Sequence, residues 1–508
     1  MTSNKCDWGS LPTEIQLDVI RLLPGVDGKC SQLAPVCRAW QSIFEPINFA
    51  EISLTLPRLG DSKSQDILFR KRNLIRYIWF RVELKEYACD KCAGEDETLW
   101  GLGDAENQSI ADVFEKLFTT LSAWEPRGDL VLDISVYSPS DNKHWFKYLT
   151  FCSDTEVPKY PSEDELHDPA HGWTDGRQTE IPTNDAIERT FDEIMGEGPF
   201  HDETMGEGLF YDEMMGEESF YDDSLEMEWW KSLPLVPVVG VVLLRQQTRR
   251  RWKPTSLANM FTRFPNMKDL CYEPWREWDD DVERQTNQRT ETLIESFAST
   301  RLCNLTIFEN FNEAYPKSYL KRSVPVAAIR KPDPAVAQKL ARASLHLTTL
   351  SASFMVEAND FFEGRRRWHS LISLALTSGT LTNDADPEDI NQMLHNAANA
   401  ALRMPRLDTM EIWNGRQGVA MVFRYEKARG RKPAMITLRG TWALDLAPEV
   451  KRAWDGVAHE TVDVQGSLID PSLIQSHGDA IRELRLSAQV VRPVSLQQIL
   501  IEDQFRAK

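Results

Sequence analysis

The sequence predicts an α/β protein in which short strands alternate with helices, preceded by a small helical unit and interrupted by an acidic insertion. Apolar residues recur at helical spacing near the start of the chain, and short alternating apolar runs separated by helical stretches begin near residue 52. That pattern stops between residues 152 and 230 and then resumes. Because 508 residues exceed the size of one hydrophobic core, we expect several units, with boundaries at 8–49, 50–151, 152–230 and 231–508.

The first unit reads as three short helices. Pro12 fits the opening turn of the first helix, where the missing N–H costs nothing, and an apolar stripe follows at helical spacing. Pro24 and Gly25 end that helix. We expect a second helix over 28–34 and a third that Pro46 ends. The apolar residues of the first and third helices are Ile15, Val19, Leu22, Leu23, Val36, Trp40, Ile43 and Phe44.

So many apolar positions on about forty residues predict a surface covered by a partner, since so short a unit buries little alone. The order LPTEI, an apolar helix and LAPVCRAW resembles the F-box, the adaptor-binding module of SCF-type ubiquitin ligases. The resemblance implies contacts with a Skp-type adaptor at Leu11, Pro12, Ile15, Val19, Ile20, Leu33, Val36, Cys37 and Trp40. The alternative is a helical cap whose proline and tryptophan are packing residues.

Residues 50–151 alternate strands with a helix. Apolar residues alternate over 52–56, 75–84 and 130–136, and a helical stretch spans 109–124. Strands that alternate with helices favour a parallel sheet. A further apolar run, Leu233 to Leu244, contains two prolines and is too short to cross a membrane, so it is read as a buried strand.

The negative charge belongs to one segment. Asp154 to Glu228 contains 24 acidic and 3 basic residues, so this segment carries −21 of a net charge of −20 and the rest of the chain carries +1. It includes the tandem decapeptides FDEIMGEGPF, HDETMGEGLF and YDEMMGEESF. A period of ten is too short for a packed repeat, and acid-rich, glycine-interrupted sequence buries little surface, so we expect disorder over 152–230. The ligand pattern of a calcium-binding EF-hand is missing.

The second half of the chain repeats the pattern L-x-x-L-x-L at irregular intervals. Asp333-Pro334, Asp386-Pro387 and Asp470-Pro471 predict helix starts between the copies. The pattern resembles a leucine-rich-repeat solenoid; an open α/β domain with parallel strands is the alternative. Residues 419–439 read as an inserted β-hairpin. The copies begin at Met267, Leu302, Leu347, Leu371, Leu407 and Ile481.

In such a solenoid the strand residues that point away from the helices line the concave face. Glu411 and the aromatic residues Trp413 and Trp442, which stand beside turn residues, are our candidates for binding a target, because aromatic residues dominate interface hot spots. The full set of predicted concave-face residues is Asp269, Cys271, Asn304, Thr306, Thr349, Ser351, Ser373, Thr409 and Glu411.

Catalytic and metal-binding motifs are missing from the sequence: no GxSxG, GxxxxGK[ST], HExxH or strand-linked GxGxxG occurs. We therefore expect neither an enzyme nor a cofactor. Cys89 and Cys92 are spaced like zinc ligands but lack a second pair nearby, which favours a structural role over metal binding. Scattered cysteines and the lack of a signal peptide predict a cytoplasmic or nuclear protein with no membrane contact.

Two basic clusters, Arg245–Pro254 and Gly364–Trp368, are read as solvated surface; pairing with the acidic insertion or contact with nucleic acid are the alternatives. Together the patterns predict the substrate-receptor subunit of an SCF ligase, similar to fungal F-box proteins with large C-terminal regions. It would bind the adaptor and, through it, a cullin, and would hold an unknown protein target. Alternatives are an F-box scaffold outside a ligase and a nucleic-acid-associated repeat protein.

Overall fold

The computed structural model of the chain describes residues 11–23, 30–87, 102, 104–162, 165–195, 223–277, 280–298, 300–313, 315 and 331–506. Cys89, Cys92 and the decapeptide repeats within 196–222 lie outside the described residues, and the predictions made for them stay predictions.

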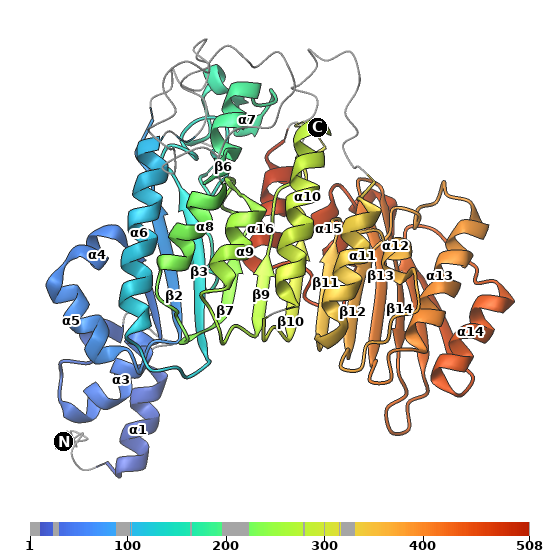
Figure 1. Ribbon diagram of the computed structural model, residues 1–508, viewed down its shortest axis with the longest axis horizontal. Helices are drawn as coiled ribbons and strands as arrows, with labels where there is room; N and C mark the ends of the chain where they lie inside the picture. Colours follow the sequence, from blue (N-terminus) through green and yellow to red (C-terminus); the bar gives the residue numbers. More distant parts are fainter. Residues whose placement is uncertain are drawn as a thin grey trace, which may run out of the picture.

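A twelve-stranded sheet runs the length of the molecule (Figure 1). The strands lie in the sheet in the order of the chain, which is the arrangement expected of a strand–helix repeat rather than a doubly wound sheet. The strands are β1 (Glu51–Thr55), β2 (Tyr77–Glu83), β3 (Leu130–Tyr137), β7 (Val239–Leu244), β9 (Asp269–Tyr272), β10 (Asn304–Phe308), β11 (Thr349–Ser353), β12 (Ser373–Thr377), β13 (Thr409–Arg416), β14 (Val419–Glu426), β15 (Met435–Gly440) and β16 (Asp463–Leu468).

Neighbouring strands from β1 to β13 are parallel. The predicted hairpin is present as β14 and β15. It is not an addition beside the sheet, however, since both strands pair antiparallel within it and β16 continues parallel to β15. Two short pairs stand apart from the main sheet: β4 (Trp173–Thr174) with β5 (Arg177–Gln178), and β6 (Glu193–Ile194) with β8 (Arg251–Trp252).

Helices that follow the strands in sequence line one face of the sheet (Figure 1). Asp333 and Asp386 cap α11 and α13 as predicted, each accepting a backbone N–H from two residues further on. The helices of this layer are α6 (Asp104–Ser122), α8 (Asp223–Ser232), α9 (Pro254–Phe261), α10 (Asp280–Phe297), α11 (Pro334–Ala343), α12 (Ala358–Phe362), α13 (Pro387–Ala401) and α14 (Pro448–Ala458).

The main core lies between the sheet and this helical layer. The central leucine of each L-x-x-L-x-L copy pairs with the same position of the next strand, which builds a continuous ladder across the sheet. All of these side chains are at most 2% exposed, because alternate residues of a strand point to the same face. The ladder is formed by Leu270, Leu305, Leu350, Leu374 and Met410.

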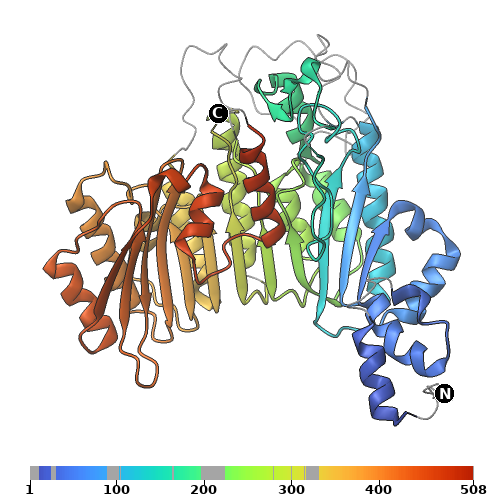
Figure 2. The ribbon, with the colours of Figure 1, turned by 180° about the vertical axis from the view of Figure 1, so that it is seen from behind.

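The C-terminal segment, residues 469–506, covers the opposite face of the sheet (Figure 2). It contains α15 (His477–Leu484) and α16 (Pro493–Gln504), preceded by the 3₁₀ helix η9 (Pro471–Leu473), which Asp470 caps. The copy of L-x-x-L-x-L at Ile481 is therefore not a strand. Ile481 and Leu484 lie one helical turn apart in α15 and face Trp413 and Val422 of the sheet in a second core.

The prediction of a disordered insertion over 152–230 is wrong for its described parts. Residues 165–195 contain the 3₁₀ helix η6 (Pro169–His171) and α7 (Asn184–Phe191), and α8 begins at Asp223. Trp173, Ile187 and Trp230 are fully buried. Aromatic side chains spaced along the acidic sequence supply the apolar surface for folding, although the overall composition of the segment is polar.

Candidate functional site

The N-terminal helical unit protrudes from the β1 end of the sheet (Figure 1). It consists of α1 (Thr13–Leu22), the 3₁₀ helix η2 (Cys30–Gln32) and α3 (Arg38–Ala50). The helix predicted to end at Pro46 continues to Ala50, with Pro46 inside it. After β1 come α4 (Leu56–Gly60) and α5 (Ser62–Lys71), which lie beside α6 at the β1 end of the sheet (Figure 1).

A small core holds the unit together. Ile20 of α1 and Phe44 of α3 are buried against each other, and Trp40 lies against Phe44 with ring centroids 5.7 Å apart. Ile20 was predicted to contact the adaptor, but at 3% exposure it is a packing residue. Leu33 and Trp40 are half-buried beside this core, so only part of each side chain is open to a partner.

An apolar stripe on α1 faces solvent. Ile15, Val19 and Leu22 are 47%, 39% and 70% exposed and recur at i, i+4 and i+7, which places them on one side of the helix. Val36, two residues before α3, is 58% exposed. Of the sixteen large apolar residues exposed in the described chain, seven lie between residues 11 and 71. Such a concentration of exposed apolar surface is typical of a protein-binding site.

The other predicted adaptor contacts lie beside this stripe in the sequence. Pro12 and Cys37 are exposed, and Leu11 is half-buried, with its carbonyl accepting a hydrogen bond from Gln16 at 2.9 Å. Eight of the nine predicted residues are therefore at least partly accessible, Ile20 being the exception.

An ion pair between α3 and α5 connects the unit to the rest of the protein, in addition to the chain itself. Lys71 of α5 forms an ion pair with Glu45 of α3 at 2.5 Å and lies 5.7 Å from the ring centroid of Phe49. Hydrogen bonds from Gln41 and from Lys71 lower the pKa of Glu45, so its carboxylate is charged at neutral pH.

The concave face predicted to receive a target is covered by the chain itself. Glu411 is 1% exposed; its carboxylate pairs with Arg424 at 2.5 Å and accepts the backbone N–H groups of Ser487 and Ala488. Trp413 is fully buried against Phe354, with ring centroids 5.2 Å apart. Both predictions of target contact are wrong, because the C-terminal segment occupies the position of a target.

The remaining predicted face residues agree with this result. Cys271 and Ser351 are buried, and the six others are half-buried: Asp269, Asn304, Thr306, Thr349, Ser373 and Thr409. Trp442 packs against the main core and is half-buried, so it alone of the three candidate target contacts retains accessible surface.

A buried polar network fixes α16 to the sheet. Glu502 accepts hydrogen bonds from Arg249 at 2.6 Å and from Tyr315 at 2.5 Å, and the hydroxyls of Tyr315 and Tyr148 lie 2.7 Å apart. Burial and the nearby Glu502 carboxylate raise the pKa of Tyr148, so its hydroxyl stays protonated. The guanidinium of Arg249 also lies 4.0 Å from the ring centroid of Trp275.

The first basic cluster, to which Arg249 belongs, is buried and paired and is not a solvated surface. Arg245, Arg249 and Arg250 are at most 3% exposed and pair with Asp133, Glu502 and Asp141, respectively. Lys253 pairs with Glu226 of the acidic segment at 3.2 Å, so the alternative of internal pairing holds there. In the second cluster, Trp368 is buried against Phe361 and cannot stack on a base.

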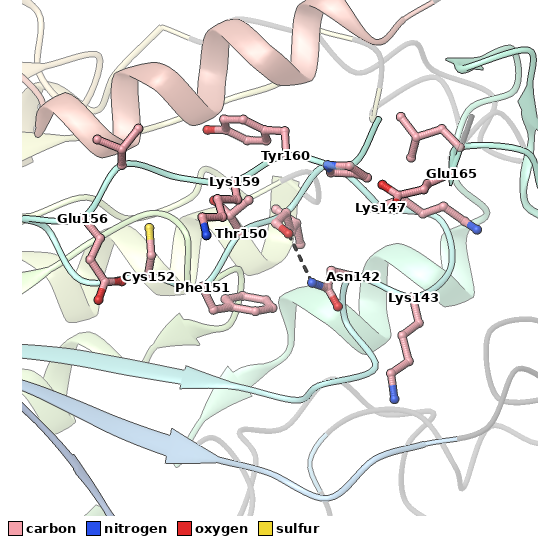
Figure 3. A pocket seen from close by; sticks show the side chains of 14 residues that line it. Asn142, Lys143, Lys147, Thr150, Phe151, Cys152, Glu156, Lys159, Tyr160 and Glu165 are labelled. Atoms are coloured by element: carbon pink, nitrogen blue, oxygen red, sulfur yellow. Dashed lines mark hydrogen bonds between the residues drawn. The ribbon is translucent and has the colours of Figure 1, made fainter. Parts of the chain in front are cut away.

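A hollow of about 880 Å³ lies beside the loop that follows β3 (Figure 3). Its wall carries groups of both signs, several of them already paired: Lys147 with Asp168 at 3.0 Å and Lys143 with Glu86 at 2.8 Å. Asn142 donates to the carbonyl of Leu149. The described residues contain no group of three or more His, Cys, Asp or Glu side chains placed to hold a metal ion.

Residues 297–492 match a family of unknown function, DUF6546. The match runs from the end of α10 to the segment before α16 and does not include the N-terminal helices. No curated protein matches the chain. Among solved structures, the leucine-rich repeat-containing protein LegL7 from Legionella pneumophila is similar with a TM-score of 0.27 at 9% identity, over 82% of this chain and 94% of that one.

None of the helices described is both long and apolar enough to cross a membrane.

Proposed function

We propose that the chain is the substrate-receptor subunit of an SCF-type ubiquitin ligase. In this proposal the N-terminal helices bind a Skp-type adaptor, which connects the chain to a cullin. The observation that carries the proposal is the apolar stripe of Ile15, Val19 and Leu22, exposed on the segment whose sequence resembles the F-box. An ordinary helical cap would bury that stripe against its own domain.

The size of the stripe is compatible with a stable complex. Full burial of an exposed aliphatic side chain contributes about 1.5–3 kcal/mol, so three side chains that are about half exposed contribute roughly 3 kcal/mol together. The exposed Val36 and Pro12 extend the apolar surface. The remaining affinity would come from the half-buried Leu33 and Trp40 at the margin of the core.

The receptor itself performs no bond chemistry in this proposal. By holding a target near the ubiquitin-loaded conjugating enzyme, it raises the effective concentration of the reacting groups. Target binding would use a surface that the C-terminal segment leaves open, since that segment fills the predicted concave face.

The test is co-purification of the full chain with a Skp-type adaptor and a cullin. The variant Ile15→Ser, Val19→Ser removes two exposed apolar side chains without entering the core of the unit, so it should fold and lose the adaptor. A matched control, Leu345→Ser, Leu402→Ser, removes two exposed leucines far from the unit and should retain the adaptor. Adaptor binding that survives in the first variant would refute the assigned surface.

The second candidate is an F-box scaffold that acts outside a ligase. The same apolar stripe supports it, because both functions need the adaptor. A complex that contains the adaptor but excludes the cullin would favour the scaffold, and a complex that contains both would favour the ligase receptor.

A further inference from the structure

The sheet edge at which the parallel strands begin is formed by a row of neighbouring turns. Backbone hydrogen bonds connect the residues that enter the strands, from β9 to the end of β14. Each bond runs from a backbone N–H to the carbonyl of the turn before it. The pairs are Cys303 to Lys268, Thr348 to Cys303, Ile372 to Thr348, Asp408 to Ile372, and Lys427 to Asp408. The turns therefore lie side by side at about the 4.8 Å spacing of strands, over roughly 25–30 Å.

These turns carry a row of exposed cations, which we call the basic edge. Each side chain is exposed and forms no ion pair with another described residue. The turn between β14 and β15 contributes the largest group and projects beyond the edge (Figure 1). The basic edge consists of Lys268, Arg301, Arg365, Arg367, Arg406, Lys427, Arg431 and Lys432.

The carboxylates in the same turns do not neutralise the row. Asp408 pairs with Arg429, which is therefore not counted in the basic edge. Asp269 and Glu363 are bonded to the neutral side chains of Asn304 and Gln338 and keep their charge, but they are fewer than the eight cations. Cations therefore remain in excess along this line, and their mutual repulsion opposes the compact state unless a partner of opposite charge lies on them.

The residue types limit the chemistry of that partner. Five of the eight cations are arginines, whose planar guanidinium groups match carboxylates and phosphates in two-point hydrogen bonding. The aromatic residues of these turns, Phe264 and Trp368, are buried, so the edge offers no platform on which unpaired bases stack.

We infer that the basic edge binds an acidic polypeptide segment, rich in Asp and Glu, that lies along the turns before β9 to β15. An extended segment of about nine residues, at about 3.3 Å per residue, spans the row. The inference goes beyond adaptor binding, because it assigns a second surface and the chemistry of its partner.

The test measures binding of a fluorescent peptide of ~12 glutamates, long enough to span the row, to the full chain by fluorescence anisotropy at low salt. The variant Arg365→Gln, Arg367→Gln, Arg406→Gln, Arg431→Gln should bind at least about tenfold more weakly. Its thermal unfolding temperature should not fall below that of the unaltered chain, since the four side chains are exposed and their mutual repulsion is removed.

A control variant separates location from net charge. Lys63→Gln, Lys85→Gln, Lys159→Gln, Arg177→Gln removes the same number of exposed cations away from the edge and should leave the affinity within about twofold. Equal weakening by both variants would overturn the inference, as would tighter binding of a DNA duplex of equal charge. Adaptor co-purification tests other residues, so either proposal can be refuted while the other stands.

Discussion

Replacement of Glu502 by glutamine tests whether the buried network holds the C-terminal segment on the sheet. Glu502 is 5% exposed and lies 2.6 Å from Arg249 and 3.4 Å from Arg506. Glutamine has the same shape but no charge, so the variant leaves Arg249 buried at 1% exposure without a carboxylate. The substitution thus changes the electrostatics and leaves the packing in place.

The magnitude follows from the pKa of Glu502. Burial alone would raise it, but the charges of Arg249 and Arg506 and the hydrogen bond from Tyr315 outweigh burial and hold it at about 2. Relative to the ordinary value of 4.5, this corresponds to about 3 kcal/mol in favour of the ionised form. Removal of one partner of a buried pair costs about 3–5 kcal/mol. We expect Glu502→Gln to lower the free energy of unfolding at pH 7 by that amount.

The assay is urea unfolding followed by tryptophan fluorescence. The control is Glu449→Gln, which breaks a 2.7 Å pair with Arg452 whose side chains are 66% and 72% exposed, and it should cost less than about 1 kcal/mol. Because the folded pKa of Glu502 is depressed, its contribution is full above about 4.5 and is lost as the pH falls toward about 2. Equal effects of the two variants at pH 7 would refute the reasoning.

Three further substitutions test the second core. Burial lowers the pKa of His477 to about 4, so between pH 6.5 and 4 only the unfolded chain takes up this proton. The protein should therefore lose about 3 kcal/mol of stability as the pH falls through that range. Unfolding titrations of His477→Gln should not show this loss. Trp413→Ala should cost about 3–5 kcal/mol in thermal unfolding, as expected of a core residue, and a cost below about 1 kcal/mol would contradict its burial. In Gly415→Ala the new Cβ would lie 2.4 Å from the Cβ of Ala480, so α15 should loosen; faster proteolysis within residues 470–506 would report it, and an unchanged rate would contradict this close packing.

The strand ladder could be predicted because its signal is local. Leucines that recur as L-x-x-L-x-L specify which side of each strand is buried, and five of the six copies are strands of the sheet. The copy at Ile481 is a helix, since a spacing of three residues also fits one helical turn. The two readings differ only in what the segment packs against.

Burial of charge could not be predicted, because the partners are distant in sequence. Arg245 and Arg249 stand in a run of basic residues, but Asp133 and Glu502 lie 112 and 253 residues away. Glu411 and Trp413 were expected on an open face for the same reason. No pattern near residue 411 indicates that residues 487 and 488 return to it.

The covering of the sheet by its last segment changes how the molecule should come apart. In an open repeat array each unit touches only its neighbours, so the array can fray from one end. Here Gln498 of α16 bonds to Tyr148 and Thr150, Ser495 accepts from Gln246, and Glu411 holds residues 487 and 488. One segment thus joins the loop after β3 to β13. Strands between these points cannot separate one at a time without breaking that closure, and the array should open as a single unit.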